Sequence, residues 1–157
     1  MRILLLNPPF YPRFSRSQRS PAVTKSGTFY YPFWLAYATG LLEKYGYEVK
    51  LLDAPAENLS RAETIKIVSE FTPQLLIIDT STPSIYNDLE IAGELKNRIP
   101  NSFCLLVGTH VSTLAEETLR MPYAIDAVAR GEYDVTVLEL AEAIKHNCLD
   151  LDRKSVV

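Results

Sequence analysis

The chain has 157 residues, of which 47% are hydrophobic and 22% charged, as is usual for one globular domain. Two cysteines exclude a disulfide framework and a four-cysteine metal site, and a net charge of −3 argues against general nucleic-acid binding. No apolar run approaches the roughly 20 residues that cross a membrane. We therefore expect a cytoplasmic domain over residues 1–147, without membrane or nucleic-acid partners, followed by a linker or C-terminal tail over 148–157.

Positive charge is concentrated near the N-terminus. Residues 1–42 contain five basic residues and no acid, whereas the rest of the chain contains 11 basic and 19 acidic residues. A basic loop on an acidic body can receive the phosphate or carboxylate of a small ligand. A solvated, partly disordered loop is the alternative interpretation.

Five short apolar runs, each followed by a turn and a helical pattern, have the length and composition of buried strands. They are Arg2–Asn7, Glu48–Leu52, Leu75–Asp79, Phe103–Val107 and Asp126–Ala129. This alternation predicts an α/β fold, a doubly wound five-stranded parallel sheet flanked by helices. We expect the strand order 2-1-3-4-5, as in Rossmann-like or flavodoxin-like domains.

The helical patterns between these strands have recognisable ends. The first, Phe33–Tyr45, ends at Gly46 in an expected left-handed conformation. Capping-box spacing starts helices at Ser60 and at Thr113, and Asp134 is expected to cap the last helix. One helix carries a core-facing stripe at steps of three and four residues, formed by Ile85, Leu89, Ala92, Leu95 and Ile99.

Residues 8–32 form a long segment without a predicted strand or helix. The segment is rich in proline, serine and arginine and contains six aromatic residues. A loop of this length in a compact domain is usually a lid, a binding loop or a disordered piece, and the aromatic residues argue against simple disorder.

The strand order also predicts where a ligand binds. Open parallel sheets bind ligands beyond the carboxyl ends of their strands, where the strand order reverses. The loops at that edge are rich in glycine and small hydroxyls. The candidate binding residues are Asn7, Pro8, Thr80, Ser81, Thr82, Ser84, Gly108, Thr109, His110, Gly131 and Glu132.

Several common ligand and reaction classes do not match these loops. The first turn has no glycine for a dinucleotide, and no Gly-Lys-Ser/Thr follows any strand. Cys104 lies inside a strand, as a core residue would, and His110 suits local bonding and ligand contact equally. Asp79 stands where a receiver domain carries its phosphoacceptor, but Asn7 replaces the acid that the receiver's metal site needs.

Four segments, in order and over almost the whole chain, resemble the cobalamin-binding domain found at the N-terminus of many radical SAM enzymes. They are Arg2–Pro9, the run Pro32–Ala38 followed by Gly40–Leu42, Val107–Ser112, and Arg130–Asp134. The last two resemble that family's G-G-x-H-x-[ST] and R-G-E-x-E motifs.

The resemblance implies that the chain binds cobalamin, with the nucleotide tail in a slot lined by the candidate residues above. Small side chains admit the benzimidazole, and hydroxyls bond its ribose and phosphate. Nothing like the D-x-H-x-x-G of methionine-synthase-like domains follows Asn7, so the corrinoid is expected to bind without that lower ligand.

The resemblance also implies a longer parent enzyme, a radical SAM methyltransferase or cyclase. The sequence lacks C-x-x-x-C-x-x-C, so S-adenosylmethionine and an iron–sulfur cluster would belong to a C-terminal radical SAM domain of that chain. This segment alone would bind and orient cobalamin without turnover. The alternatives are a degenerate interaction domain of the same fold and a receiver-like signalling domain with Asp79 as phosphoacceptor.

Overall fold

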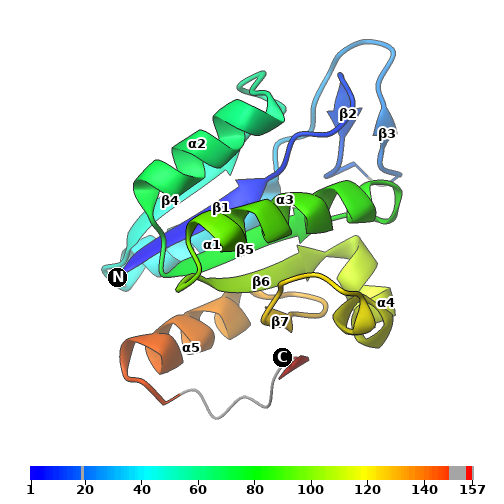
Figure 1. The fold of residues 1–157 in the computed structure, drawn as a ribbon. Coiled ribbons are helices and arrows are strands. Elements are labelled where there is room, and N and C mark those ends of the chain that lie inside the picture. Colours follow the sequence, from blue (N-terminus) through cyan, green and yellow to red (C-terminus); the bar gives the residue numbers. More distant parts are fainter. Residues whose placement is uncertain (19, 149–154, 157) are drawn as a thin grey trace.

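A parallel sheet forms the centre of the computed structural model, which describes residues 1–18, 20–148 and 155–156 (Figure 1). Its five main strands lie in the order β4-β1-β5-β6-β7, which confirms the predicted order 2-1-3-4-5. Ser155–Val156, β8, pairs in parallel with β7 at the edge. The main strands are β1 (Arg2–Asn7), β4 (Glu48–Asp53), β5 (Leu75–Thr80), β6 (Phe103–Gly108) and β7 (Ala127–Val128).

Helices cover both faces of the sheet. On one face lie α1 (Phe33–Lys44) and α5 (Asp134–Lys145). On the other lie α2 (Arg61–Phe71), α3 (Ile85–Arg98) and α4 (Thr109–Arg120), with a 3-10 turn, η1 (Thr82–Ser84), leading into α3. This arrangement confirms the predicted α/β layers.

The central strands are buried on both sides, and their side chains alternate between two cores. In β1, Leu4 and Leu6 pack towards α2 and α3, whereas Ile3 and Leu5 pack towards α1 and α5. All four side chains are fully buried. Two-sided burial explains why the strands read as continuous apolar runs rather than as alternating patterns.

Most of the predicted helix ends are confirmed. Gly46 follows α1 with a φ of 81°, in the left-handed region. The capping box at Ser60 is formed, since Glu63 N–H donates to Ser60 Oγ and Ser60 N–H donates to the Glu63 carboxylate. The predicted stripe on α3 is buried from Ile85 to Ile99.

Two helix starts were predicted wrongly. Helix α4 begins at Thr109 rather than after Thr113, whose hydroxyl donates back to the Thr109 carbonyl inside the helix. A kink at Leu114, with φ −117° and ψ 41°, interrupts α4 close to the expected start. Asp134 is the first residue of α5 rather than its cap, and as a first-turn acid it still faces the positive end of the helix dipole.

Residues 8–32, here called the arm, contain a small antiparallel hairpin. Its strands are β2 (Phe14–Ser15) and β3 (Ala22–Val23), and they stand beyond the end of β1 (Figure 1). Phe14 and Ser15 are buried, whereas Ala22 and Val23 are exposed. One strand of the hairpin therefore packs on the domain and the other faces outward.

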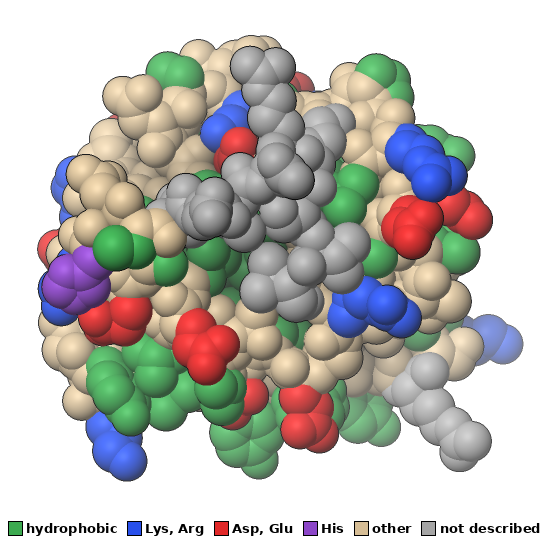
Figure 2. Space-filling view, turned by 90° about the horizontal axis from the view of Figure 1, so that it is seen from below, with side chains coloured by type: hydrophobic (Ala, Val, Ile, Leu, Met, Phe, Trp, Pro, Cys, Tyr) green, Lys and Arg blue, Asp and Glu red, His purple; other side chains and the backbone are tan. Residues whose placement is uncertain are grey.

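The face seen from below carries acidic and basic side chains interspersed with hydrophobic ones (Figure 2). No helix in the described ranges is long and apolar enough to cross a membrane. Part of the predicted tail over 148–157, namely residues 149–154 and 157, lies outside the described residues.

Candidate functional site

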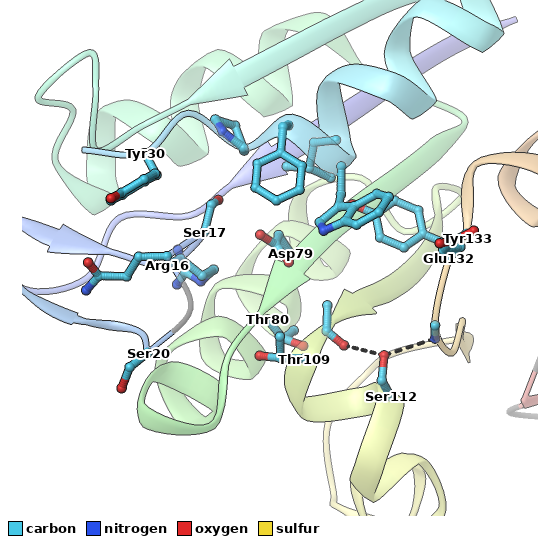
Figure 3. Close-up of a pocket in the computed structure, with 17 residues that line it drawn as sticks. Arg16, Ser17, Ser20, Tyr30, Asp79, Thr80, Thr109, Ser112, Glu132 and Tyr133 are labelled. Atoms are coloured by element: carbon cyan, nitrogen blue, oxygen red, sulfur yellow. Dashed lines mark hydrogen bonds between the residues drawn. The ribbon is translucent and has the colours of Figure 1, made fainter.

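A pocket of about 760 Å³ opens at the carboxyl-end edge of the sheet, where the strand order predicts a ligand (Figure 3). One side is formed by strand ends and the segments that follow them, and the other by the arm and the start of α1. We call these the strand-end wall and the arm wall. The strand-end wall consists of Asp79, Thr80, Gly108, Thr109, Ser112, Gly131, Glu132 and Tyr133; the arm wall consists of Arg16, Ser17, Gln18, Ser20, Tyr30, Pro32, Phe33, Trp34 and Leu35.

Gly108 brings the strand-end wall together because no side chain fits at its position. A Cβ there would lie 2.3 Å from Asp79 Oδ1 and 2.4 Å from the Thr80 carbonyl oxygen. The φ of 101° is also unfavourable for any L-residue with a side chain. The close approach of β6 to the end of β5 therefore requires glycine.

Ser112 joins two parts of the same wall. Its hydroxyl donates to the Gly108 carbonyl at 2.8 Å and accepts from the Gly131 N–H at 3.0 Å (Figure 3). One side chain on α4 thus fixes the end of β6 against the loop after β7. Thr80 adds a bond between β5 and β6, since its hydroxyl donates to the Val107 carbonyl at 2.6 Å.

Arg16 attaches the arm to the domain. Its side chain is 2% exposed and its Nη2 lies 2.7 Å from Oδ1 of Asp88, which is fully buried. Nη2 also donates to Ser84 Oγ, and Nη1 donates to Asn7 Oδ1 and to the Pro8 carbonyl. A single guanidinium therefore bonds to the end of β1, to η1 and to α3.

Asp79 has different surroundings from Asp88. Its carboxyl lies at the floor of the pocket, bonded to the backbone N–H of Thr80. Burial is the main cause that raises the pKa of Asp79 to about 7, and the charges of Asp88 and Asp53 add to it. Arg16 acts in the opposite direction without compensating for the burial.

Two buried polar atoms that belong to pocket-lining residues have no hydrogen-bond partner among the described residues. They are the Tyr133 hydroxyl and Arg16 Nε. Burial and the nearby charge of Asp79 raise the pKa of Tyr133, so its hydroxyl keeps its proton. Buried polar groups in native proteins are nearly always paired, which makes these atoms candidates for ligand contact.

The structure separates the residues that the sequence marked as candidates. Five of them line the pocket: Thr80, Gly108, Thr109, Gly131 and Glu132. The others lie beside it in a hydrogen-bonded cluster or deeper under η1. Asn7, Pro8 and Ser84 bond to Arg16, Ser81 bonds to Ser84, and Thr82 lies 3.3 Å from His110 Nδ1.

Sequence reasoning missed Arg16, Ser112, Trp34 and Tyr133 as site residues. The sequence did show the basic excess of the arm and the segments that contain Trp34, Ser112 and Tyr133. It did not indicate which of the arm's four basic residues turns inward, because that depends on the position of Asp88 across the fold.

The site offers groups that can bind an organic ligand. Burial raises the pKa of the Cys104 thiol to about 12, so this core residue is not a nucleophile. No cluster of three or more His, Cys, Asp or Glu within the described ranges could hold a metal ion. The pocket combines apolar rings, hydroxyls, glycine backbone, one guanidinium and the two carboxyls of Asp79 and Glu132, a composition suited to holding an organic ligand.

Comparison with protein families matches residues 19–141 to the B12 binding domain. An uncharacterized methyltransferase from Pyrococcus horikoshii is 33% identical over 144 residues, which cover 92% of this chain and 29% of that protein. An anaerobic magnesium-protoporphyrin IX monomethyl ester cyclase from Synechocystis is 32% identical over 155 residues, with 96% and 29% covered. The chain thus spans less than a third of the length of these relatives.

A solved structure with the same fold is the radical S-adenosylmethionine methyltransferase TsrM from Kitasatospora setae, with cobalamin and a [4Fe-4S] cluster bound. It superposes with a TM-score of 0.69 at 21% identity, over 93% of this chain and 25% of that one. At this identity the likeness supports the fold alone.

Proposed function

The chain belongs to the B12-binding domain family, and from that premise we propose that its pocket holds the nucleotide tail of cobalamin between the strand-end wall and the arm wall. The close approach at Gly108 is the observation that carries this placement. It leaves an opening of about 760 Å³ at the edge where such sheets bind ligands.

The residues of the pocket fit such a tail. Exposed faces of Phe33 and Trp34 can pack against an aromatic base, and the Tyr133 hydroxyl and Arg16 Nε need partners. Thr109, Ser112 and the glycine backbone supply further groups for a ribose and a phosphate. Of the candidates named from the sequence, we propose that Thr80, Gly108, Thr109, Gly131 and Glu132 contact the ligand directly. Asn7, Pro8, Ser81, Thr82, Ser84 and His110 would act by supporting the wall.

We further propose that the chain gives the corrinoid no lower axial ligand. No His, Cys or Met is found among the residues that line the pocket in the described part of the chain. His110 is 4% exposed and lies under η1, beside Thr82. When bound, cobalamin supplies a cobalt centre that carries a methyl group or electrons. This chain would bind the cofactor, orient it and shield it from water.

The relatives suggest a setting for this module. They include proteins named as a methyltransferase and as cyclases, and the superposed structure is a radical SAM methyltransferase. We propose that the module serves a radical SAM enzyme of one of these two reaction classes, which supplies S-adenosylmethionine chemistry and the substrate site.

Binding is tested by mixing the purified chain with hydroxocobalamin and following co-elution on gel filtration and the visible spectrum. We expect co-elution, with the spectrum of a corrinoid that has no protein imidazole on cobalt. No co-elution with an intact fold by circular dichroism would refute cobalamin binding and favour an interaction-only domain. Stable phosphorylation of Asp79 by acetyl phosphate would instead favour the receiver-like alternative.

The location is tested with a matched pair of substitutions on one helix. Thr109 and Thr113 are both exposed on α4, one turn apart, and only Thr109 lines the pocket. Thr109→Trp is expected to weaken binding by at least about 100-fold, because an indole would occupy the opening. Thr113→Trp is expected to leave it within about twofold. Equal effects of the two substitutions would refute the placement.

A further inference from the structure

Asp79 points into the middle of the pocket, between the arm and the start of α4 (Figure 3). Its carboxyl accepts a hydrogen bond from the Thr80 N–H, and no side-chain donor among the described residues bonds to it. The Tyr133 hydroxyl, on the same wall, also lacks a partner there. The pocket therefore contains a carboxyl whose bonding capacity is free for a ligand, together with a buried hydroxyl that has no partner among the described residues.

The Asp79 carboxyl is packed closely against the backbone of β6 at Gly108. Oδ1 of Asp79 lies only 2.3 Å from the point that a Cβ on residue 108 would occupy. The glycine thus makes room for the carboxyl rather than for a side chain of its own. Any molecule that fills the pocket has to meet this group.

The charged surroundings do not neutralise an ionised Asp79. Facing it from the packed elements are Arg16 on the arm, Asp88 on α3, Asp53 on β4 and Tyr133 after β7. Arg16 is the single cation of this group, and Asp88 forms an ion pair with it at 2.7 Å. Burial accordingly raises the pKa of Asp79 to about 7, so half of the molecules carry a proton there near neutral pH.

A ligand in the pocket would remove the water that still reaches this carboxyl. An anion left without water or a donor is strongly disfavoured, whereas a protonated carboxyl can donate its proton to an acceptor of the ligand. Entry of a tail with a phosphate diester adds repulsion against an ionised form. Each of these effects favours the neutral acid in the complex.

We propose that Asp79 is a specificity-determining residue of this pocket, which binds the ligand as a neutral carboxylic acid, donates a hydrogen bond to it and takes up one proton from solvent. The proton binds to a carboxylate oxygen, and no bond of the ligand is made or broken. The inference rests on the proposed function, since it concerns cobalamin in this site. An ionised Asp79 that accepts a hydrogen bond from the ligand would give the opposite pH dependence.

The test measures the dissociation constant of cyanocobalamin, whose own charge is constant over the range, between about pH 6 and about pH 8. With a pKa of about 7 in the free protein and binding by the neutral acid, affinity is expected to fall about tenfold across that range. Asp79→Asn keeps a donor and cannot ionise, so its affinity should stay level and close to the low-pH value of the native chain. Glu139→Gln, on the exposed face of α5, should retain the tenfold slope.

A second measurement needs no variant and so does not depend on the folding of Asp79→Asn. Calorimetric titration of the native chain near pH 7 in two buffers of different ionisation enthalpy should show uptake of about half a proton per cobalamin. Zero uptake, proton release, or a pH slope that survives in Asp79→Asn would overturn the inference while leaving cobalamin binding intact. No binding at either pH would instead overturn the proposed function.

Discussion

The two walls of the pocket are held in place by different means. The strand-end wall is built into the sheet, where Gly108, Ser112 and the strand register fix its shape through several short contacts. The arm wall depends on the Arg16 guanidinium, which makes all its bonds inside the protein. One wall is therefore specified by local geometry, whereas the part of the other wall around Arg16 is specified by the long-range bonds of one guanidinium.

The largest effect on the arm wall is expected from Arg16→Met, which keeps much of the bulk of the side chain and removes its charge. Asp88 would be left buried without its partner, so we expect a loss of about 3–5 kcal/mol in the free energy of unfolding. Urea titration measures this loss, and limited proteolysis should show earlier cleavage within residues 8–32.

The control for this prediction is Arg61→Met. Arg61 also contacts two carboxylates, those of Glu90 and Glu94, but its side chain is 36% exposed. Its loss should cost no more than about 1 kcal/mol. Equal losses in the two variants would contradict the assignment of the arm's attachment to Arg16.

Gly108→Ala tests the strand-end wall in the same assay. The added methyl group meets backbone at 2.4 Å in a left-handed conformation, so we expect a loss of at least about 2 kcal/mol. Gly40→Ala serves as the matched control because Gly40 lies in α1, exposed, with open space around its Cα. There alanine should stabilise the helix by about 0.5–1 kcal/mol. An unchanged free energy of unfolding in Gly108→Ala would show that the close approach of β6 to β5 does not require glycine.

Asp79→Asn is expected to have a smaller effect on stability, and this effect depends on pH. A folded-state pKa of about 7 against an ordinary value of 3.8 means that the folded chain holds this proton more tightly than the unfolded chain. That stability is fully present below about pH 4 and is lost as the pH rises through about 7. The difference between 3.8 and about 7 corresponds to about 4 kcal/mol at full strength, and the solvent that reaches this half-buried carboxyl reduces it. The substitution should therefore stabilise the unliganded chain by about 1–2 kcal/mol at pH 8 and flatten its stability profile.

Thermal unfolding of both chains at several pH values checks this prediction. Some decline in stability with rising pH should remain in the variant, because burial also raises the pKa of Asp88. Unchanged profiles in the two proteins would show that Asp79 is ionised in the fold at all of these pH values.

Ser112→Ala is expected to have the smallest effect. It removes the donor to the Gly108 carbonyl and the acceptor for the Gly131 N–H, and we expect a loss of about 1 kcal/mol. The hydroxyl of the neighbouring Thr113 makes a contact of 3.5 Å to the Thr109 carbonyl. Thr113→Ala should therefore change the free energy of unfolding by less than about 0.5 kcal/mol. Hydrogen exchange at Gly131 should become faster in Ser112→Ala alone.

The same contrast explains what could be predicted from the sequence. Strands buried on both faces leave continuous apolar runs, so the five main strands and their order followed from pattern and the handedness of crossovers. The strand-end wall followed from that order, because Thr80 and Gly108 are the last residues of β5 and β6 and Gly131 lies in the loop after β7.

The arm wall could not be derived in this way. Its hairpin has only two residues in each strand, too few for a periodic signal. Its anchor joins residues 16 and 88, which nothing in the local sequence relates. The start of α4 was missed for a related reason: Gly108 precedes the helix to allow close packing with β5, and its capping signal is absent.

The placement of cobalamin between the two walls is tested most directly by the NMR signals of the glycines in the chain. The chain has six, so a sample labelled with [15N]glycine gives a short, assignable set of amide resonances. Gly108 and Gly131 line the pocket, whereas Gly40, Gly46 and Gly93 lie outside it. On titration with cyanocobalamin we expect the first two signals to shift and the other three to stay in place. Shifts at Gly40, Gly46 or Gly93 without shifts at Gly108 and Gly131 would contradict the placement of cobalamin between the two walls.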